Sequence, residues 1–224
     1  MAGLEDAFES FLDWAFSLLP DPGPSARPAT PASIAGIPSP PEKLITLVGR
    51  TSVGKSSTAN SLIGVSAFPT GIEHGTTTSF LREQYRSGYV IQDTPGLLDS
   101  ASTPIDILRA AIRGGIVLYV TTGQLYREEI AFIKMLHFYQ AHWTDSYFKY
   151  MPRHLLLFVN MNDTKVRSMP SATRQRELEL LVAQVSEWVP RERIAVGSAA
   201  PDDRSPPDVD ALANLLAAHG TGIG

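Results

Sequence analysis

Hydrophobic positions from residue 42 onward fall into short apolar runs that alternate with stretches of helical periodicity. The expected strands are 44–48, 78–85, 89–92, 116–121, 155–160 and 194–196, and the expected helices are 55–64, 104–112, 125–140, 171–188 and 207–218. This alternation predicts an α/β fold of three layers, a mostly parallel sheet with helices on both faces. The turn Ser87-Gly88 is too short for a parallel crossover, so one antiparallel edge pair is expected.

The first 41 residues have a different pattern. Apolar residues between 4 and 19 recur at helical spacing and leave an acidic polar face, which predicts an amphipathic helix in residues 1–19. This helix packs on its own domain or docks on a partner or second copy, and its acidic face disfavours anionic lipid. Eight prolines in 20–41 predict a stiff linker, either a plain spacer or a ligand for a proline-recognising domain. The main domain is then 42–224.

A glycine-rich segment follows the first expected strand. Gly49 is separated by four residues from Gly54-Lys55-Ser56, which is the phosphate-loop pattern G-x-x-x-x-G-K-[ST] between a strand and a helix. Converging backbone N–H groups and a helix N-terminus bind phosphate in such loops, Lys55 adds a cation, and the Ser56 hydroxyl can bind Mg²⁺. A chance match on a glycine-rich turn is the alternative. The residues expected to bind nucleotide are Gly49, Arg50, Thr51, Ser52, Val53, Gly54, Lys55, Ser56 and Ser57.

Two further motifs follow in the order found in P-loop GTPases, which the chain resembles over about residues 42–218. Asp93-Thr94-Pro95-Gly96 matches D-x-x-G, so the resemblance implies that Asp93 holds Mg²⁺ and that the Gly96 N–H senses the γ-phosphate. Gly75-Thr76-Thr77-Thr78 resembles the first switch, and the family pattern assigns the Mg²⁺-binding hydroxyl to Thr77. Thr76 and Thr78 are rivals for this role, and three β-formers entering a strand is the plain alternative.

The expected strand 155–160 ends in Asn160-Met161-Asn162-Asp163, which resembles the guanine motif Asn-Lys-x-Asp with methionine in place of lysine. Asp163 would accept hydrogen bonds from guanine that adenine cannot donate, so GTP or GDP is expected and an ATP-dependent kinase is disfavoured. Ser198 and Ala199 resemble the loop in which a backbone N–H meets the guanine O6. A polar turn after a strand is the alternative for the guanine motif taken alone.

Segments 54–64 and 93–97 are similar to septin-like GTPases, among them the chloroplast-import receptors and the immunity-associated proteins, and nearly as similar to bacterial Era-like GTPases. Leu97 stands where Ras-like enzymes carry a water-orienting glutamine, and Ser52 stands where potassium-activated relatives carry asparagine. The resemblance therefore implies slow GTP hydrolysis with Lys55 and Thr77 as catalytic residues, and a dimer or partner contact through the switch regions that stimulates it. Leu97 and Leu98 are expected to offer apolar surface for that contact. A nucleotide-dependent scaffold without hydrolysis is the alternative.

The amino-acid composition argues against several other kinds of function. The formal charge of -4 argues against a nucleic-acid partner, and the absence of cysteine excludes disulfides, thiolate nucleophiles and Cys-zinc sites. The five histidines lack metal-ligand spacing, and only His74, beside the switch threonines, has a plausible site role. No run of about 18 apolar residues is present to span a bilayer. We expect a cytoplasmic protein that does not bind membranes.

Overall fold

The computed structural model describes residues 43–70, 80–97, 104–113, 115–142, 154–161, 169–199 and 207–221. The expected N-terminal helix and proline-rich linker lie outside these residues, and so do two predicted site residues, Thr77 and Asp163. These predictions therefore stay predictions.

One sheet of six strands organises the described residues, in the order β2-β3-β1-β4-β5-β6. The strands are β1 (Lys43–Val48), β2 (Leu81–Gln84), β3 (Tyr89–Asp93), β4 (Ile116–Thr121), β5 (His154–Asn160) and β6 (Ile194–Gly197). All neighbouring strands run parallel except β2 and β3, which pair antiparallel at one edge. This topology confirms the predicted mostly parallel sheet with one antiparallel edge pair.

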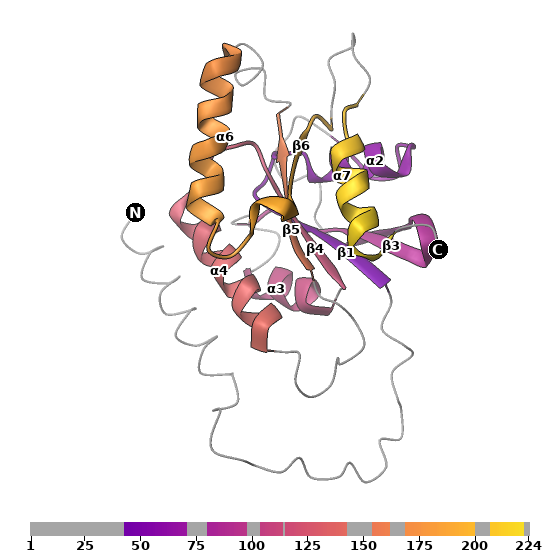
Figure 1. Cartoon of the computed structure of the whole chain (residues 1–224). Coiled ribbons are helices and arrows are strands. Elements are labelled where there is room, and N and C mark those ends of the chain that lie inside the picture. The colour runs from indigo at the N-terminus through magenta and orange to yellow at the C-terminus, as the bar shows by residue number, and fades with distance from the viewer. Residues whose placement is uncertain are drawn as a thin grey trace, which may run out of the picture. The chain divides into compact units, whose positions relative to one another are not determined.

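Helices cover both faces of the sheet (Figure 1). They are α2 (Lys55–Ile63), α3 (Pro104–Arg113), α4 (Arg127–His142), α6 (Ser171–Val185) and α7 (Asp210–Leu216), with short helical turns η1 (Arg86–Gly88), η3 (Arg191–Arg193) and η4 (Ala217–Thr221). Figure 1 shows α4 and α6 on the side of the sheet opposite α2 and α7. None of the described helices combines the length and the apolar character needed to cross a bilayer.

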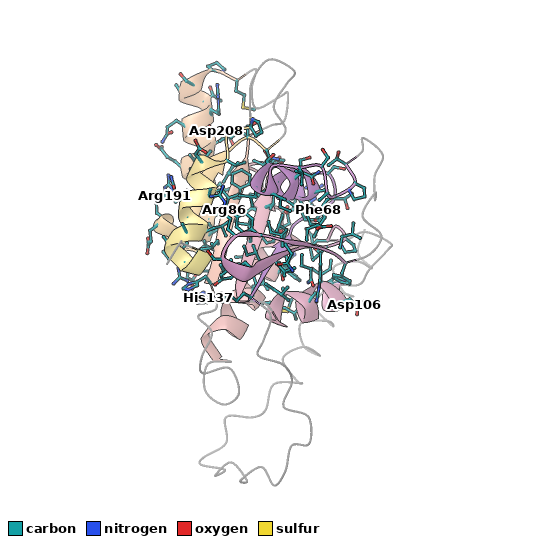
Figure 2. The ribbon with its side chains drawn as sticks, turned by 90° about the vertical axis from the view of Figure 1, so that its right-hand side faces the viewer. Phe68, Arg86, Asp106, His137, Arg191 and Asp208 are labelled. Atoms are coloured by element: carbon teal, nitrogen blue, oxygen red, sulfur yellow. The ribbon has the colours of Figure 1, made fainter. Side chains whose placement is uncertain are left out.

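The last helix begins later than the sequence predicts. It starts at Asp210 rather than at residue 207. The reason is a pair of backbone hydrogen bonds: the Ser198 N–H donates to the Asp208 oxygen at 2.7 Å, and the Asp208 N–H donates to the Ser198 oxygen at 2.8 Å. Asp208, labelled in Figure 2, lies near the upper end of α7. Both backbone polar groups of Asp208 are used in the β-bridge to Ser198, so this residue does not join the helix.

The central strands β1, β4 and β5 are buried along nearly their whole length, which explains their continuous apolar sequences. One core cluster joins alternate strand residues to α2 and α7, for example Leu47 and Phe158 to Ala59 and Leu212. The carboxyl ends of the parallel strands all open onto one edge of the sheet. Ligands of open α/β sheets bind at this edge, and the predicted site residues follow these strand ends.

Candidate nucleotide-binding site

The segment between β1 and α2 turns tightly at its glycines. Gly54 has a φ of 90°, and a Cβ at this position would lie 2.3 Å from the side-chain nitrogen of Asn160. Gly49 has a φ of 153°, and a Cβ there would lie 2.2 Å from the carbonyl oxygen of Val120. Both positions therefore require glycine, for backbone conformation and for space. The turn delivers the chain into α2 with the helix N-terminus at the edge of the sheet where ligands are expected.

Lys55 begins α2 and is 6% exposed. Its ammonium donates a hydrogen bond to the backbone oxygen of Arg50 at 3.0 Å. The lysine head group thus lies across the curl of the loop instead of extending into solvent. A cation held in this place is suited to bind the polyphosphate that the loop pattern predicts.

Ser56 and Asp93 are brought together from α2 and the end of β3. The Ser56 hydroxyl donates to a carboxylate oxygen of Asp93 at 2.6 Å, and Asp93 is fully buried. Hydroxyl and carboxylate oxygens are the ligands that Mg²⁺ prefers in proteins. Two of the three residues predicted to hold magnesium therefore form a donor set that fits the ion, and the third, Thr77, lies outside the described residues.

The D-x-x-G segment lies directly against the glycine-rich turn. Leu97 pairs with Arg50 in a parallel bridge, and its N–H donates to the Gly49 oxygen at 3.0 Å. A Cβ at Gly96 would lie 2.0 Å from the hydroxyl oxygen of Thr51, so only glycine fits. The Leu97 side chain is 5% exposed. The prediction that Leu97 offers apolar contact surface is therefore wrong, because the bridge to Arg50 turns this side chain inward; Leu98 lies outside the described residues.

Asn160 connects three of the predicted motifs from a buried position at the end of β5. Its amide nitrogen donates to the Val53 oxygen at 3.0 Å, and its amide oxygen accepts from the Ala199 N–H at 3.0 Å. The Ser61 hydroxyl of α2 donates to the Ala199 oxygen. Both backbone polar groups of Ala199 thus have partners within the chain. A backbone N–H of the loop that contains Ser198 and Ala199 is predicted to meet guanine O6. If the Ala199 N–H makes this contact, the base must share or replace its bond to Asn160.

A group of side chains that the motifs do not include adjoins the glycine-rich turn. Glu129, in the first turn of α4, is 1% exposed. It accepts hydrogen bonds from the Tyr119 hydroxyl at 3.0 Å and from the Tyr126 N–H at 3.1 Å. The Arg50 guanidinium lies 3.8 Å from the same carboxylate and 4.2 Å from the centre of the Tyr126 ring.

Burial dominates the electrostatics of this group. It raises the pKa of the Glu129 carboxyl, against the opposing effects of the hydrogen bonds from Tyr126 and Tyr119 and of the Arg50 charge. Burial, followed by the charge of Glu129, raises the pKa of Tyr119 well above its ordinary value. Sequence reasoning missed Glu129, although a signal exists: the buried Phe132, Ile133 and Leu136 follow it at helical spacing, which places it on the apolar face of α4.

One known protein family matches the segment that contains the glycine-rich turn. The model of the AIG1 family matches residues 43–136. A search of the curated proteins gives no match.

Three solved structures share the fold. An Era variant from Aquifex aeolicus bound to GDP.AlF4- is 15% identical with a TM-score of 0.58, covering 79% of this chain and 56% of its own. Era in complex with MgGDPNP and a 16S ribosomal RNA fragment is 13% identical with a TM-score of 0.52 and the same two coverages. An S. thermophilus NFeoB variant bound to GMPPNP is 18% identical with a TM-score of 0.54, covering 81% of this chain and 64% of its own.

The chain spans little more than half the length of the Era chains it matches. The shared fold, together with the family match over the segment that holds Lys55, Ser56 and Asp93, confirms the resemblance drawn from the motifs. The chain therefore has the fold of the P-loop GTPases, and the segment that the AIG1 family model matches contains its glycine-rich turn.

Proposed function

We propose that the chain is a GTP-binding switch protein that hydrolyses GTP slowly and requires Mg²⁺. The observation that carries this proposal is the approach of the Ser56 hydroxyl to the Asp93 carboxylate at 2.6 Å, at the start of the helix that also bears Lys55. A phosphate-binding turn with an oxygen donor pair beside it is the arrangement that a magnesium–nucleotide complex needs.

In this proposal, different residues bind the phosphates and the Mg²⁺ ion. The backbone N–H groups of the turn 49–54, the N-terminus of α2 and Lys55 bind the phosphates. Ser56 and Asp93 hold Mg²⁺, and the resemblance adds Thr77 as a further ligand and Gly96 as a γ-phosphate contact. Bound Mg²⁺ neutralises the charge that develops on the phosphate oxygens during transfer.

Base choice rests on Asn160 and Asp163. The amide of Asn160 is hydrogen-bonded to the turn at Val53 and to the loop at Ala199, so it connects the phosphate-binding turn to the loop that is expected to meet the base. Asp163 is the residue that distinguishes guanine from adenine in this proposal, because adenine would leave its carboxylate without a hydrogen-bond donor. GTP and GDP are therefore the proposed ligands.

Slow hydrolysis follows from the surroundings of Leu97. Its side chain is aliphatic and buried, so it cannot orient a water molecule for attack on the γ-phosphate. Positioning of the nucleophile is a large part of phosphoryl-transfer catalysis, and a group supplied in trans accelerates it by about 10³ to 10⁵. We therefore propose that dimerisation or a partner protein, acting through the switch regions, stimulates the slow reaction for which Lys55 and Thr77 are the candidate catalytic residues.

Two measurements test the proposal. Titration with fluorescent GDP in the presence of Mg²⁺, with unlabelled GDP and ADP as competitors, should show displacement by GDP alone; equal displacement by ADP contradicts the guanine assignment. Single-turnover GTP hydrolysis should then be slow but measurable. Tight binding without any phosphate release, with or without added partner, supports the scaffold alternative instead.

A further inference from the structure

We propose that Glu129 is a positioning residue of the nucleotide site, which acts through Arg50 on the backbone carbonyl that holds the Lys55 ammonium. The inference rests on the proposed function, because it concerns the same site. No motif of the sequence assigns a role to Glu129, and the contacts around it supply the argument.

The Glu129 carboxylate is held from two elements besides the turn. Tyr119 on β4 donates its hydroxyl to one oxygen, and the Tyr126 N–H, just before α4, donates to the other. With 1% exposure, the carboxylate has lost nearly all contact with water. A buried carboxylate is costly unless such donors and a cation compensate it. Its position in the fold is therefore fixed by β4 and α4, and a charge fixed in this way can serve as an anchor.

The Arg50 side chain contacts this fixed carboxylate. Its guanidinium is drawn to the carboxylate by the charges, 3.8 Å apart, and stacks on the Tyr126 ring at 4.2 Å. The side chain is only 39% exposed although it projects from a surface turn. Stacking and a fixed planar charge suit arginine and not lysine. The two contacts restrain the Arg50 side chain, and with it the Arg50 peptide.

The Arg50 peptide group also contacts residues that are proposed to bind the phosphates. Its carbonyl oxygen accepts the Lys55 ammonium at 3.0 Å. Arg50 also pairs with Leu97, whose N–H bonds to the adjoining Gly49 at 3.0 Å. A shift of the Arg50 backbone therefore moves the phosphate-binding cation and the end of the D-x-x-G segment together. Glu129 is connected to both through a single residue.

The central experiment replaces Glu129 by glutamine and measures the affinity for fluorescent GDP with Mg²⁺ in the full chain. Glu129→Gln keeps the shape and an oxygen acceptor but removes the charge that attracts Arg50. We expect GDP affinity to fall about tenfold. Glu128→Gln is the matched control, because Glu128 is the adjacent carboxylate and is only half-buried. The GDP affinity of this variant should equal that of the unaltered chain.

A double-mutant cycle tests the route through Arg50. If Glu129 acts through Arg50, Glu129→Gln should weaken GDP binding little further in an Arg50→Ala background. Full additivity of the two changes would overturn the proposal. So would unaltered affinity of Glu129→Gln in a protein whose urea unfolding shows that it is folded.

The pH profile separates positioning from a purely structural role. The charged and titratable groups around Glu129 are Arg50, Tyr119 and the neighbouring Glu128. Acidification from neutral pH toward the range in which ordinary carboxyls titrate protonates Glu129 before they do, because burial raises its pKa. GDP affinity of the unaltered chain should fall more steeply over this range than that of Glu129→Gln, which cannot titrate. Parallel profiles contradict the positioning role.

The failures of the two proposals are distinguishable. An unaltered chain that binds no GDP removes the proposed function, whereas binding that is indifferent to Glu129 removes only the positioning role. If Glu129→Gln does not fold, Arg50→Lys provides the second test. It keeps the charge but loses the planar stacking, so GDP affinity should fall while the urea midpoint stays close to that of the unaltered chain. Unchanged affinity in Arg50→Lys and Arg50→Ala would overturn the proposal.

Discussion

The amide nitrogen of Asn160 donates to the backbone oxygen of Val53 at 3.0 Å, so the last residue of β5 is hydrogen-bonded to the glycine-rich turn. Its amide oxygen binds Ala199 at the same time. A single buried side chain therefore connects the glycine-rich turn to the loop that follows β6.

Asn160→Asp should weaken both folding and GDP binding. A carboxylate can still accept from Ala199 but cannot donate to Val53, and its second oxygen faces the Val53 oxygen. Leaving a buried group without its partner costs about 1–3 kcal/mol. Urea unfolding should show this loss, and fluorescent GDP should bind more weakly. An unchanged midpoint contradicts the importance of the Val53 bond.

Lys55→Ala should abolish tight nucleotide binding. The phosphates would lose their principal cationic partner, at a cost on the order of several kcal/mol for an uncompensated buried charge. Lys134→Ala is the control, because Lys134 is exposed and lies over Trp188 on the surface. Equal GDP affinity in both variants would refute the phosphate-loop assignment.

Asp163→Asn should change base preference. An amide at this position donates where the carboxylate accepts, which suits xanthine with its additional carbonyl and not guanine. Competition between GDP and xanthosine diphosphate measures the change. If the variant still prefers GDP as strongly as the unaltered chain, another residue reads the base.

Turnover per molecule should rise with protein concentration or on addition of a partner. The expectation follows from the buried aliphatic Leu97, which leaves the nucleophile to be placed from outside. GTP hydrolysis measured across a dilution series, with sedimentation in GTP and in GDP alongside, checks it. A rate that is flat and fast in dilute solution shows that a residue within the chain positions the water.

Stability should fall on mild acidification because of a histidine pair. The Nδ1 atoms of His154 and His219 lie 3.1 Å apart. Burial, with the charges of His219 and Arg193, lowers the pKa of His154 from 6.5 to about 4. The unfolded chain therefore binds more protons in this window, so stability is complete above about pH 6.5 and declines toward about pH 4. Urea midpoints between about pH 7 and about pH 5 should fall in the unaltered chain and flatten in His154→Gln.

Local motifs predict much of the fold and the candidate site. The loop pattern and the strand before it place Lys55 and Ser56 at a helix start, and the strand ending at Asp93 supplies the second oxygen donor. These features depend on neighbouring residues in the chain and on the rule that parallel strands end at one edge. Sequence reasoning could therefore anticipate the Ser56–Asp93 approach.

Contacts between distant elements could not be predicted in this way. Leu97 is buried because a backbone bridge to Arg50 turns it inward, and α7 starts late because Asp208 pairs with Ser198. Glu129 sits on the buried face of its helix because partners on β4 and in the glycine-rich turn compensate its charge. Each of these outcomes depends on a partner that sequence periodicity does not identify.

The bridge between Ser198 and Asp208 has a practical consequence for protein engineering. The two residues exchange both backbone hydrogen bonds, so the chain that departs after β6 returns to the same place before α7 begins. We expect an insertion between Ala199 and Asp208 to leave β6 and α7 in place, because the bridge holds the two ends of this segment together. A fluorophore inserted there should respond to GDP if the proposed base site is correct, because Ala199 lies next to one end of the bridge.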